Sequence, residues 1–268
     1  MSADQFDHRL IVFTDLDGTL LDHDTYEWQA AKPALQQLTF RNIPLVLVSS
    51  KTFVELSHYR DALKLEYPVV SENGAAIHMA GQEFPDTLSV DGAVSRAELQ
   101  EVYRAIKADG GYRCEAFFEL GTDGIVRETG LSEERAAMAN ERVASEPIHW
   151  SDTEAHAMAF AAEARKRGLS CVRGGRFLHL LGQTSKQKAV QQLIDAYADR
   201  YAGDHVLSVS LGDGPNDIGM LETTDIAVVI PGRHEHDMTL TTQNRIVRPA
   251  AHGPEGWNEA MVSLLAEY

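Results

Sequence analysis

The most informative segment of this chain for its fold is Leu10-Ile11-Val12-Phe13-Thr14-Asp15-Leu16-Asp17-Gly18-Thr19. Its first four residues form an uninterrupted apolar run, which is typical of a strand buried on both faces in a parallel sheet. Asp15 and Asp17 follow where the chain leaves that strand. Both carboxylates should therefore point into the crevice at the carboxyl edge of the sheet, where open α/β sheets bind ligands. Gly18 permits a turn, and Thr19 offers a hydroxyl and a backbone N–H to a nearby anion.

A second acidic segment lies far along the chain. The apolar run at residues 206–211 leads directly into Gly212-Asp213-Gly214-Pro215-Asn216-Asp217. Taken alone, Asp15-Leu16-Asp17-Gly18 would be a solvated turn, and the position of its glycine excludes an EF-hand calcium loop. Two acidic strand ends in one doubly wound sheet can instead converge on a single divalent cation. Because Mg²⁺ prefers oxygen ligands and usually works beside substrate phosphate, the pair of segments predicts a Mg²⁺ site.

With these motifs the chain resembles the haloacid dehalogenase superfamily of Mg²⁺-dependent phosphohydrolases. Asp15 and Asp17 match the nucleophile and the acid/base of the first motif of that superfamily. Ser49, at the end of an expected strand, matches the second-motif hydroxyl that binds the phosphoryl group. Lys186, at the start of an expected helix, matches the third-motif lysine. The resemblance implies hydrolysis of a phosphate monoester through an aspartyl-phosphate intermediate.

The fourth motif of the superfamily is acidic, and Asp213 and Asp217 match it. Asn216 and Asp217 are interpreted either as ion ligands or as supports that orient Asp213 or Lys186. The resemblance therefore implies Mg²⁺ as the cofactor. Its candidate ligands are Asp15, Asp17 (through the backbone carbonyl), Asp213, Asn216 and Asp217.

Four further segments are similar to the mannosyl-3-phosphoglycerate phosphatase family. They are Ser49-Ser50-Lys51-Thr52, Ser71-Glu72-Asn73-Gly74, Arg173-Gly174-Gly175-Arg176-Phe177 and Gly253-Pro254-Glu255-Gly256-Trp257-Asn258. This similarity implies hydrolysis of mannosyl-3-phosphoglycerate to mannosylglycerate, a compatible solute, and phosphate. One departure is Ser185-Lys186-Gln187, where the family usually reads Asp-Lys-Gly. The departure leaves another glycosyl-phosphoglycerate or a simple sugar phosphate open as the substrate.

Several cationic and polar side chains are candidates for contacts to a phosphorylated small molecule. A guanidinium matches a carboxylate bidentately, so Arg173 or Arg176 is expected to hold the glycerate carboxylate. A hairpin turn at Gly174-Gly175 would instead leave one of these arginines merely exposed. The predicted substrate contacts are Thr19, Lys51, Arg173, Arg176 and Lys188.

The hydrophobic pattern divides the chain into core, insertion and core. The first 70 residues alternate between strand and helix patterns, which predicts a doubly wound parallel-sheet (Rossmann-like) core. From residue 81 to residue 182 the pattern indicates a mixed α+β insertion, where the superfamily carries its larger type of cap domain. The insertion includes an expected strand at residues 114–120 and an expected helix from Ser151, whose Ser-x-x-Glu reads as a capping box. The predicted domains are thus residues 1–80 (core), 81–182 (cap) and 183–268 (core).

The composition limits the kinds of binding partner and indicates the cellular compartment. The chain has 268 residues and a formal net charge of −16, which disfavours nucleic acid and anionic membranes as partners. No apolar stretch approaches the length of a membrane span. The two cysteines, Cys114 and Cys171, lack metal-ligand spacing and indicate buried thiols in a reducing cytoplasm. We expect a cytoplasmic monomer or small homo-oligomer.

Three rival functions share some of these motifs. A phosphomutase of the same superfamily would differ only in returning the phosphoryl group to a substrate. A phosphorylatable receiver module also combines strand-end aspartates, a hydroxyl and a lysine, but it lacks an insertion of roughly a hundred residues. A catalytically silent sugar-phosphate sensor would not need the complete set of acidic residues and lysine. Turnover of an aryl phosphate separates an enzyme from the last two.

Overall fold

A computed structural model describes residues 8–79, 90–174, 176–201, 205–232 and 238–268. The chain divides into two compact units, Met1–Ser49 with Lys186–Tyr268, and Ser50–Ser185. The predicted boundary between residues 80 and 81 lies outside the described residues, so the division into residues 1–80, 81–182 and 183–268 stays a prediction. Within the described ranges, no helix has the length and apolar character needed to cross a membrane.

Within its described residues, the first unit contributes five parallel strands in the order β11-β10-β9-β1-β2 to one sheet. Thr14 at the end of β1 is in register with Leu47 on β2 and with Leu211 on β9. Since the strands are parallel and in register, their carboxyl ends meet at one edge of the sheet. The apolar run that precedes Thr14 is buried, and its last three residues are completely so, as its pattern predicts. The strands are β1 (His8–Thr14), β2 (Leu45–Val48), β9 (His205–Gly212), β10 (Ile226–Val229) and β11 (Arg245–Val247).

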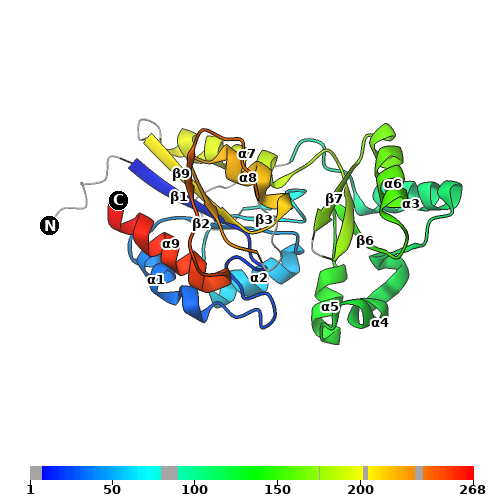
Figure 1. Ribbon diagram of the computed structural model, residues 1–268, viewed down its shortest axis with the longest axis horizontal. Helices are drawn as coiled ribbons and strands as arrows, with labels where there is room; N and C mark the ends of the chain where they lie inside the picture. The colour runs from blue at the N-terminus through cyan, green and yellow to red at the C-terminus, as the bar shows by residue number, and fades with distance from the viewer. Residues whose placement is uncertain (1–7, 80–89, 175, 202–204, 233–237) are drawn as a thin grey trace. The chain divides into compact units, whose positions relative to one another are not determined.

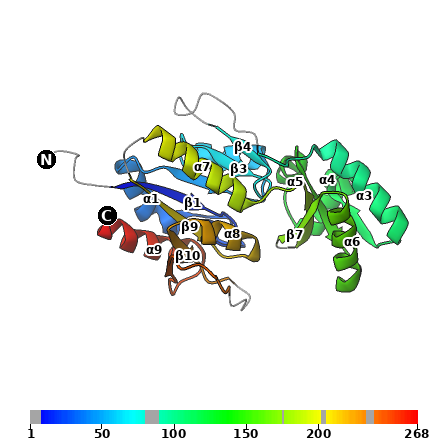
Figure 2. The ribbon, with the colours of Figure 1, turned by 90° about the horizontal axis from the view of Figure 1, so that it is seen from above.

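Helices cover both faces of this sheet, which confirms the predicted doubly wound α/β core. Helix α1 packs against α9 on one face, and α7 packs against α8 on the other (Figures 1 and 2). Short 3-10 turns precede α1 and α8, at Gln29–Ala31 and Pro215–Asp217. The helices are α1 (Lys32–Phe40), α7 (Lys186–Arg200), α8 (Ile218–Thr223) and α9 (Gly253–Glu267).

The second unit is α+β. Among its described residues, a four-stranded antiparallel sheet has the order β5-β6-β8-β7, and β3 pairs with β4 in antiparallel fashion. Leu178 and Leu180 of β8 join a core with helices α3 and α6, whereas Phe177 packs on Phe117 of α4. Because neighbouring strand residues face opposite sides, the two cores lie on opposite faces of this sheet. The strands are β3 (Val69–Ser71), β4 (Ala76–His78), β5 (Cys114–Ala116), β6 (Ser145–Trp150), β7 (Ser170–Gly174) and β8 (Phe177–Leu181). The helices are α2 (Phe53–Ala62), α3 (Arg96–Gly110), α4 (Phe117–Thr129), α5 (Glu133–Asn140) and α6 (Glu154–Lys166).

Two expectations about the second unit are wrong. The expected strand at residues 114–120 ends at Ala116, because Glu119 accepts the N–H of Ala116 at 3.1 Å and starts helix α4 there. The expected helix start at Ser151 is also displaced. Thr153 is the N-cap of α6 and accepts the His156 N–H at 3.2 Å, whereas the Ser151 hydroxyl donates to a backbone carbonyl.

Candidate active site

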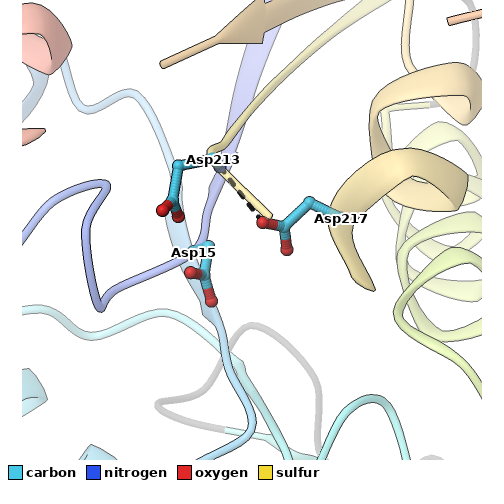
Figure 3. A group of neighbouring side chains, drawn as sticks. All are labelled: Asp15, Asp213 and Asp217. Atoms are coloured by element: carbon cyan, nitrogen blue, oxygen red, sulfur yellow. Dashed lines mark hydrogen bonds between the residues drawn. The ribbon is translucent and has the colours of Figure 1, made fainter. Parts of the chain in front are cut away.

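Three carboxylates gather at the carboxyl edge of the parallel sheet. Asp15 follows β1, Asp213 follows β9, and Asp217 ends the 3-10 turn that leads into α8. One oxygen atom from each of the three lies within 4.8 Å of the others, and Figure 3 shows the three side chains close together. The parallel register of β1 and β9 explains why residues almost 200 positions apart meet here.

Lys186 places a buried cation among these carboxylates. It is the first residue of α7, and its side chain is only 1% exposed. Its Nζ lies 2.6 Å from Asp15 Oδ1 and 2.7 Å from Asp217 Oδ1. Burial alone would lower the pKa of Lys186, but its two carboxylate partners raise that pKa above its usual value. The lysine therefore stays charged and offsets part of the negative charge of the cluster.

Asp217 is held by the backbone as well as by the lysine. Its Oδ2 accepts the N–H of Gly214 at 3.0 Å. It also accepts the N–H of Asp213 at 3.2 Å, which is the dashed line in Figure 3. A Cβ added at Gly212 would lie 2.5 Å from the Cβ of Asp217, so this close approach requires glycine. Of the two roles expected for Asp217, these contacts support the one in which it orients Asp213 and Lys186.

Gly18 and Thr19 hold the carboxylate of Asp213 from the other side. Gly18 has a φ of +82°, and a Cβ there would lie 2.5 Å from Asp213 Oδ2. The Thr19 hydroxyl donates to Asp213 Oδ1 at 2.8 Å, and the Thr19 N–H donates to the Leu16 carbonyl at 3.1 Å. Both donors expected to contact substrate are thus used within the protein. The hydroxyl of Thr19 therefore contacts Asp213 directly, and a contact of Thr19 with substrate stays a prediction.

The electrostatics of the cluster suit a divalent cation. Burial, followed by the charge of Asp217, raises the pKa of Asp213 to about 6. Burial also raises the pKa of Asp15, against the opposing effect of Lys186. Three crowded carboxylates with a single lysine leave negative charge that a bound cation would balance. The oxygen donors are of the kind that Mg²⁺ prefers, so these residues fit the predicted ion.

The other predicted site residues are divided between the two units. In the first unit, Ser49 is buried directly after β2, and Lys188 is exposed on α7. Asp17 and Asn216 are half-buried, and each is within two positions of a carboxylate of the cluster in the sequence. In the second unit, exposed Arg173 donates to Glu154 Oε2 at 2.8 Å, and exposed Arg176 donates to the Thr129 carbonyl at 3.1 Å. Lys51 also belongs to the second unit, where its carbonyl accepts the Glu72 N–H at 2.9 Å.

Two residues beside Asp15 were not among the predicted site residues. Trp257 is completely buried and donates its indole N–H to Thr14 at 3.0 Å. A buried tryptophan normally finds an acceptor for that N–H, which is the signal that points beyond packing. The identity of the acceptor could not be predicted, because Thr14 lies 243 positions away.

Comparisons with known proteins agree with this geometry. The profile of the haloacid dehalogenase-like hydrolase family matches residues 12–163. A glucosyl-3-phosphoglycerate/mannosyl-3-phosphoglycerate phosphatase of Methanococcoides burtonii is 33% identical over 270 residues, which cover 96% of this chain and 97% of the relative.

Solved structures share the fold at lower identity. A phosphatase of this superfamily from Bacteroides thetaiotaomicron has a TM-score of 0.69 at 18% identity, covering 100% of this chain and 99% of its own. A subclass IIB sugar phosphatase has a TM-score of 0.66 at 19% identity, and the match covers 95% of this chain and 98% of the phosphatase. The sucrose-phosphatase of Synechocystis sp. PCC6803 has a TM-score of 0.65 at 17% identity, covering 96% and 98%. The chain therefore belongs to the haloacid dehalogenase-like hydrolase family and is a phosphoric monoester hydrolase.

Proposed function

We propose that this protein hydrolyses a glycosyl-3-phosphoglycerate, mannosyl-3-phosphoglycerate in the first place, and that Asp15 is its nucleophile. The observation that carries the nucleophile assignment is the placement of Asp15 at a strand end, 2.6 Å from the buried cation of Lys186. The relative from Methanococcoides burtonii, a glucosyl-3-phosphoglycerate/mannosyl-3-phosphoglycerate phosphatase, supports the substrate class. The four segments shared with the mannosyl-3-phosphoglycerate phosphatase family support it as well.

The proposed reaction proceeds in two displacements. An Asp15 carboxylate oxygen attacks phosphorus, and the bond to the leaving oxygen breaks while Asp17 donates a proton to that oxygen. Asp17 then removes a proton from water, which attacks the aspartyl-phosphate and releases phosphate and free Asp15. Ser49 and Lys186 would hold the phosphoryl oxygens and offset their charge. Mg²⁺, held by Asp15, the Asp17 carbonyl and Asp213, would supply charge neutralisation at the phosphoryl group.

Replacing Asp15 tests the nucleophile. An amide cannot attack phosphorus, so Asp15→Asn should remove essentially all turnover of p-nitrophenyl phosphate while the thermal unfolding curve stays cooperative. Asp225→Asn is the matched control, because Asp225 binds Ser208 within the same unit and plays no part in the cluster. Retention of more than a small fraction of activity in pure Asp15→Asn protein would reject the assignment.

Leaving-group dependence tests Asp17. General acid catalysis contributes about 10²–10⁴-fold, so Asp17→Asn should lose roughly that factor in kcat with an alkyl phosphate. An aryl phosphate should lose less, because its leaving group is already a weak base. Equal losses on both substrates would show that Asp17 is not the proton donor.

Arginine substitutions test the glycerate carboxylate. Losing the arginine that holds it should cost about 2–5 kcal/mol in kcat/KM with mannosyl-3-phosphoglycerate and little with an aryl phosphate. Arg173→Ala and Arg176→Ala are the test variants. Arg167→Ala is the control, since Arg167 pairs only with surface carboxylates in the described contacts. Equal losses on both substrates, or none in either variant, would exclude these arginines from glycerate binding and make a plain sugar phosphate the better substrate.

A further inference from the structure

A buried hydrogen-bond chain reaches the backbone of Asp15 from the last helix of the protein. The indole N–H of Trp257 in α9 lies 3.0 Å from Thr14 Oγ1, and Thr14 Oγ1 lies 2.7 Å from the carbonyl oxygen of Asp15. The side chains of Trp257 and Thr14 are completely buried. All three residues belong to the first unit.

The chemistry of the groups fixes which atom donates and which accepts in each of these hydrogen bonds. An indole N–H can only donate, so the Thr14 oxygen must accept from Trp257. The single hydroxyl hydrogen of Thr14 is then available for the Asp15 carbonyl, which can only accept. The Asp15 N–H donates in turn to the Leu211 carbonyl on β9 at 2.9 Å. Both polar backbone groups of Asp15 are therefore fixed at the point where regular strand β1 ends.

The residues around Trp257 hold the start of helix α9 close to the turn that contains Gly18. Gly253 starts the helix with a φ of +51°, and a Cβ there would lie 4.0 Å from the Gly18 carbonyl oxygen. A Cβ at Gly256 would lie 2.1 Å from the Ala251 carbonyl oxygen, so only glycine fits one residue before the tryptophan. Asn258, one residue after it, accepts the Ala34 N–H at 3.0 Å and ties the helix to α1. The first turn of α9 is thus held where the indole can reach Thr14.

We propose that Thr14 and Trp257 are positioning residues, which hold the backbone of Asp15 so that its carboxylate is presented for attack on phosphorus. The proposal rests on the proposed function in taking Asp15 as the nucleophile. Because both side chains are completely buried, we expect neither of them to touch the substrate. Their removal should therefore lower kcat, because a near-attack geometry is lost, and leave KM almost unchanged.

Near-isosteric variants test this role. Thr14→Val removes the hydroxyl, and Trp257→Phe removes the N–H while an aromatic ring remains. We expect each to lower kcat for p-nitrophenyl phosphate by roughly twofold to twelvefold, the range that one hydrogen bond typically supplies. Thr14→Ser, which keeps the hydroxyl, should restore most of the rate. Thr224→Val is the matched control, since Thr224 is also completely buried and its hydroxyl bonds Ser210 and the Ile226 carbonyl away from the cluster.

A second readout does not require turnover. Beryllium trifluoride forms an acyl-phosphate mimic on an aspartate carboxylate, so its affinity in the presence of Mg²⁺, measured by calorimetry, reports how well Asp15 is presented. We expect the affinity to fall in Thr14→Val and Trp257→Phe and to remain at the wild-type level in Thr14→Ser and Thr224→Val. The melting temperature of each variant is recorded in parallel.

The outcomes separate the two proposals. If Asp15→Asn is inactive but Thr14→Val and Trp257→Phe keep wild-type kcat and beryllium trifluoride affinity, the positioning role is wrong and the proposed function stands. A lowered melting temperature without a change in either readout would show a purely structural role and would also overturn the inference. If no phosphate ester is hydrolysed, the proposed function fails, and loss of affinity in the two variants would still support positioning. A wild-type protein that neither turns over nor binds the mimic would refute both.

Discussion

Lys186 is a cation that the protein has removed almost completely from water. Its two ion pairs, with Asp15 and Asp217, are 2.6 and 2.7 Å long. Losing one partner of a buried pair usually costs more than the pair itself contributes, because the remaining charges lose their compensation. The residue is therefore expected to matter for folding as well as for phosphoryl binding.

Lys186→Met tests this double role. We expect the free energy of unfolding at pH 7 to fall by about 3–5 kcal/mol, since two carboxylates lose their cation. The deficit should shrink towards pH 5, because burial raises the pKa of Asp15 and a proton can then neutralise that carboxylate. Urea unfolding at the two pH values measures both effects, with Lys188→Met as the control for an exposed lysine on the same helix. An unchanged stability at pH 7 would contradict the importance of the buried pairs.

Asp213 should make the metal-free protein less stable as the pH rises. Its pKa is 3.8 as an ordinary side chain and about 6 in the folded protein. Between these values the folded state binds more protons than the unfolded state, so the free energy of unfolding falls as the pH rises through this window. In EDTA, Asp213→Asn should therefore melt at a higher temperature than the wild type at pH 8. The two proteins should converge near pH 4, and a constant difference across this range would argue against a raised pKa.

The turn after strand β1 combines a left-handed backbone with a close approach. Gly18→Ala would add a Cβ 2.5 Å from Asp213 Oδ2 at a φ of +82°. Gly111→Ala is a matched control, because Gly111 has a φ of +63° and no atom within 4 Å of an added Cβ. Left-handed backbone alone should cost about 1–2 kcal/mol in each variant. Only Gly18→Ala should also lose turnover and Mg²⁺ affinity, because only there must the carboxylate move. Equal behaviour of the two variants would show that the turn does not position Asp213.

Elements with a regular pattern were predictable from the sequence, and those decided by distant partners were not. Strand β2, at residues 45–48, ends directly before Ser49 as expected, because its four consecutive apolar residues are buried on both faces. The aromatic residues at 117–118 are compatible with a strand and with a helix. A helix forms because the carboxylate of Glu119 accepts the Ala116 N–H and also binds Lys107 from helix α3. Contacts of this kind cannot be read from local pattern alone.

The cluster itself follows the same rule. Asp15, Asp213 and Lys186 could be placed together from their positions at two strand ends and a helix start. The engagement of Thr19 with Asp213 could not, because a hydroxyl after a glycine serves a substrate anion or a protein acceptor equally well. Only the register of β1 with β9 settles which acceptor is near.

For the molecule as a whole, we expect that binding of a divalent cation raises the melting temperature. The chain carries a formal net charge of −16, and its buried carboxylates should attract divalent ions. A saturating ligand at a hundred times its Kd stabilises by about 2.7 kcal/mol, which shifts the melting temperature by roughly 5–11 °C in a protein of this size class. Mg²⁺ should give such a shift at pH 8 and EDTA should reverse it. Asp213→Asn should show little shift, and an equal shift in that variant would place the ion elsewhere.

The pairing of the first strand with one from the far end of the chain has a consequence for biosynthesis. His8 on β1 is aligned with His205 on β9, and the cation beside Asp15 comes from residue 186. At about 5–20 residues per second, a ribosome needs roughly 10–40 s to make the intervening segment. During that time the apolar residues of β1 lack their later neighbour, and the nascent chain carries the aspartate without the lysine. Newly made protein should therefore depend on chaperones in this interval, and competence for phosphoryl transfer should arise late in synthesis.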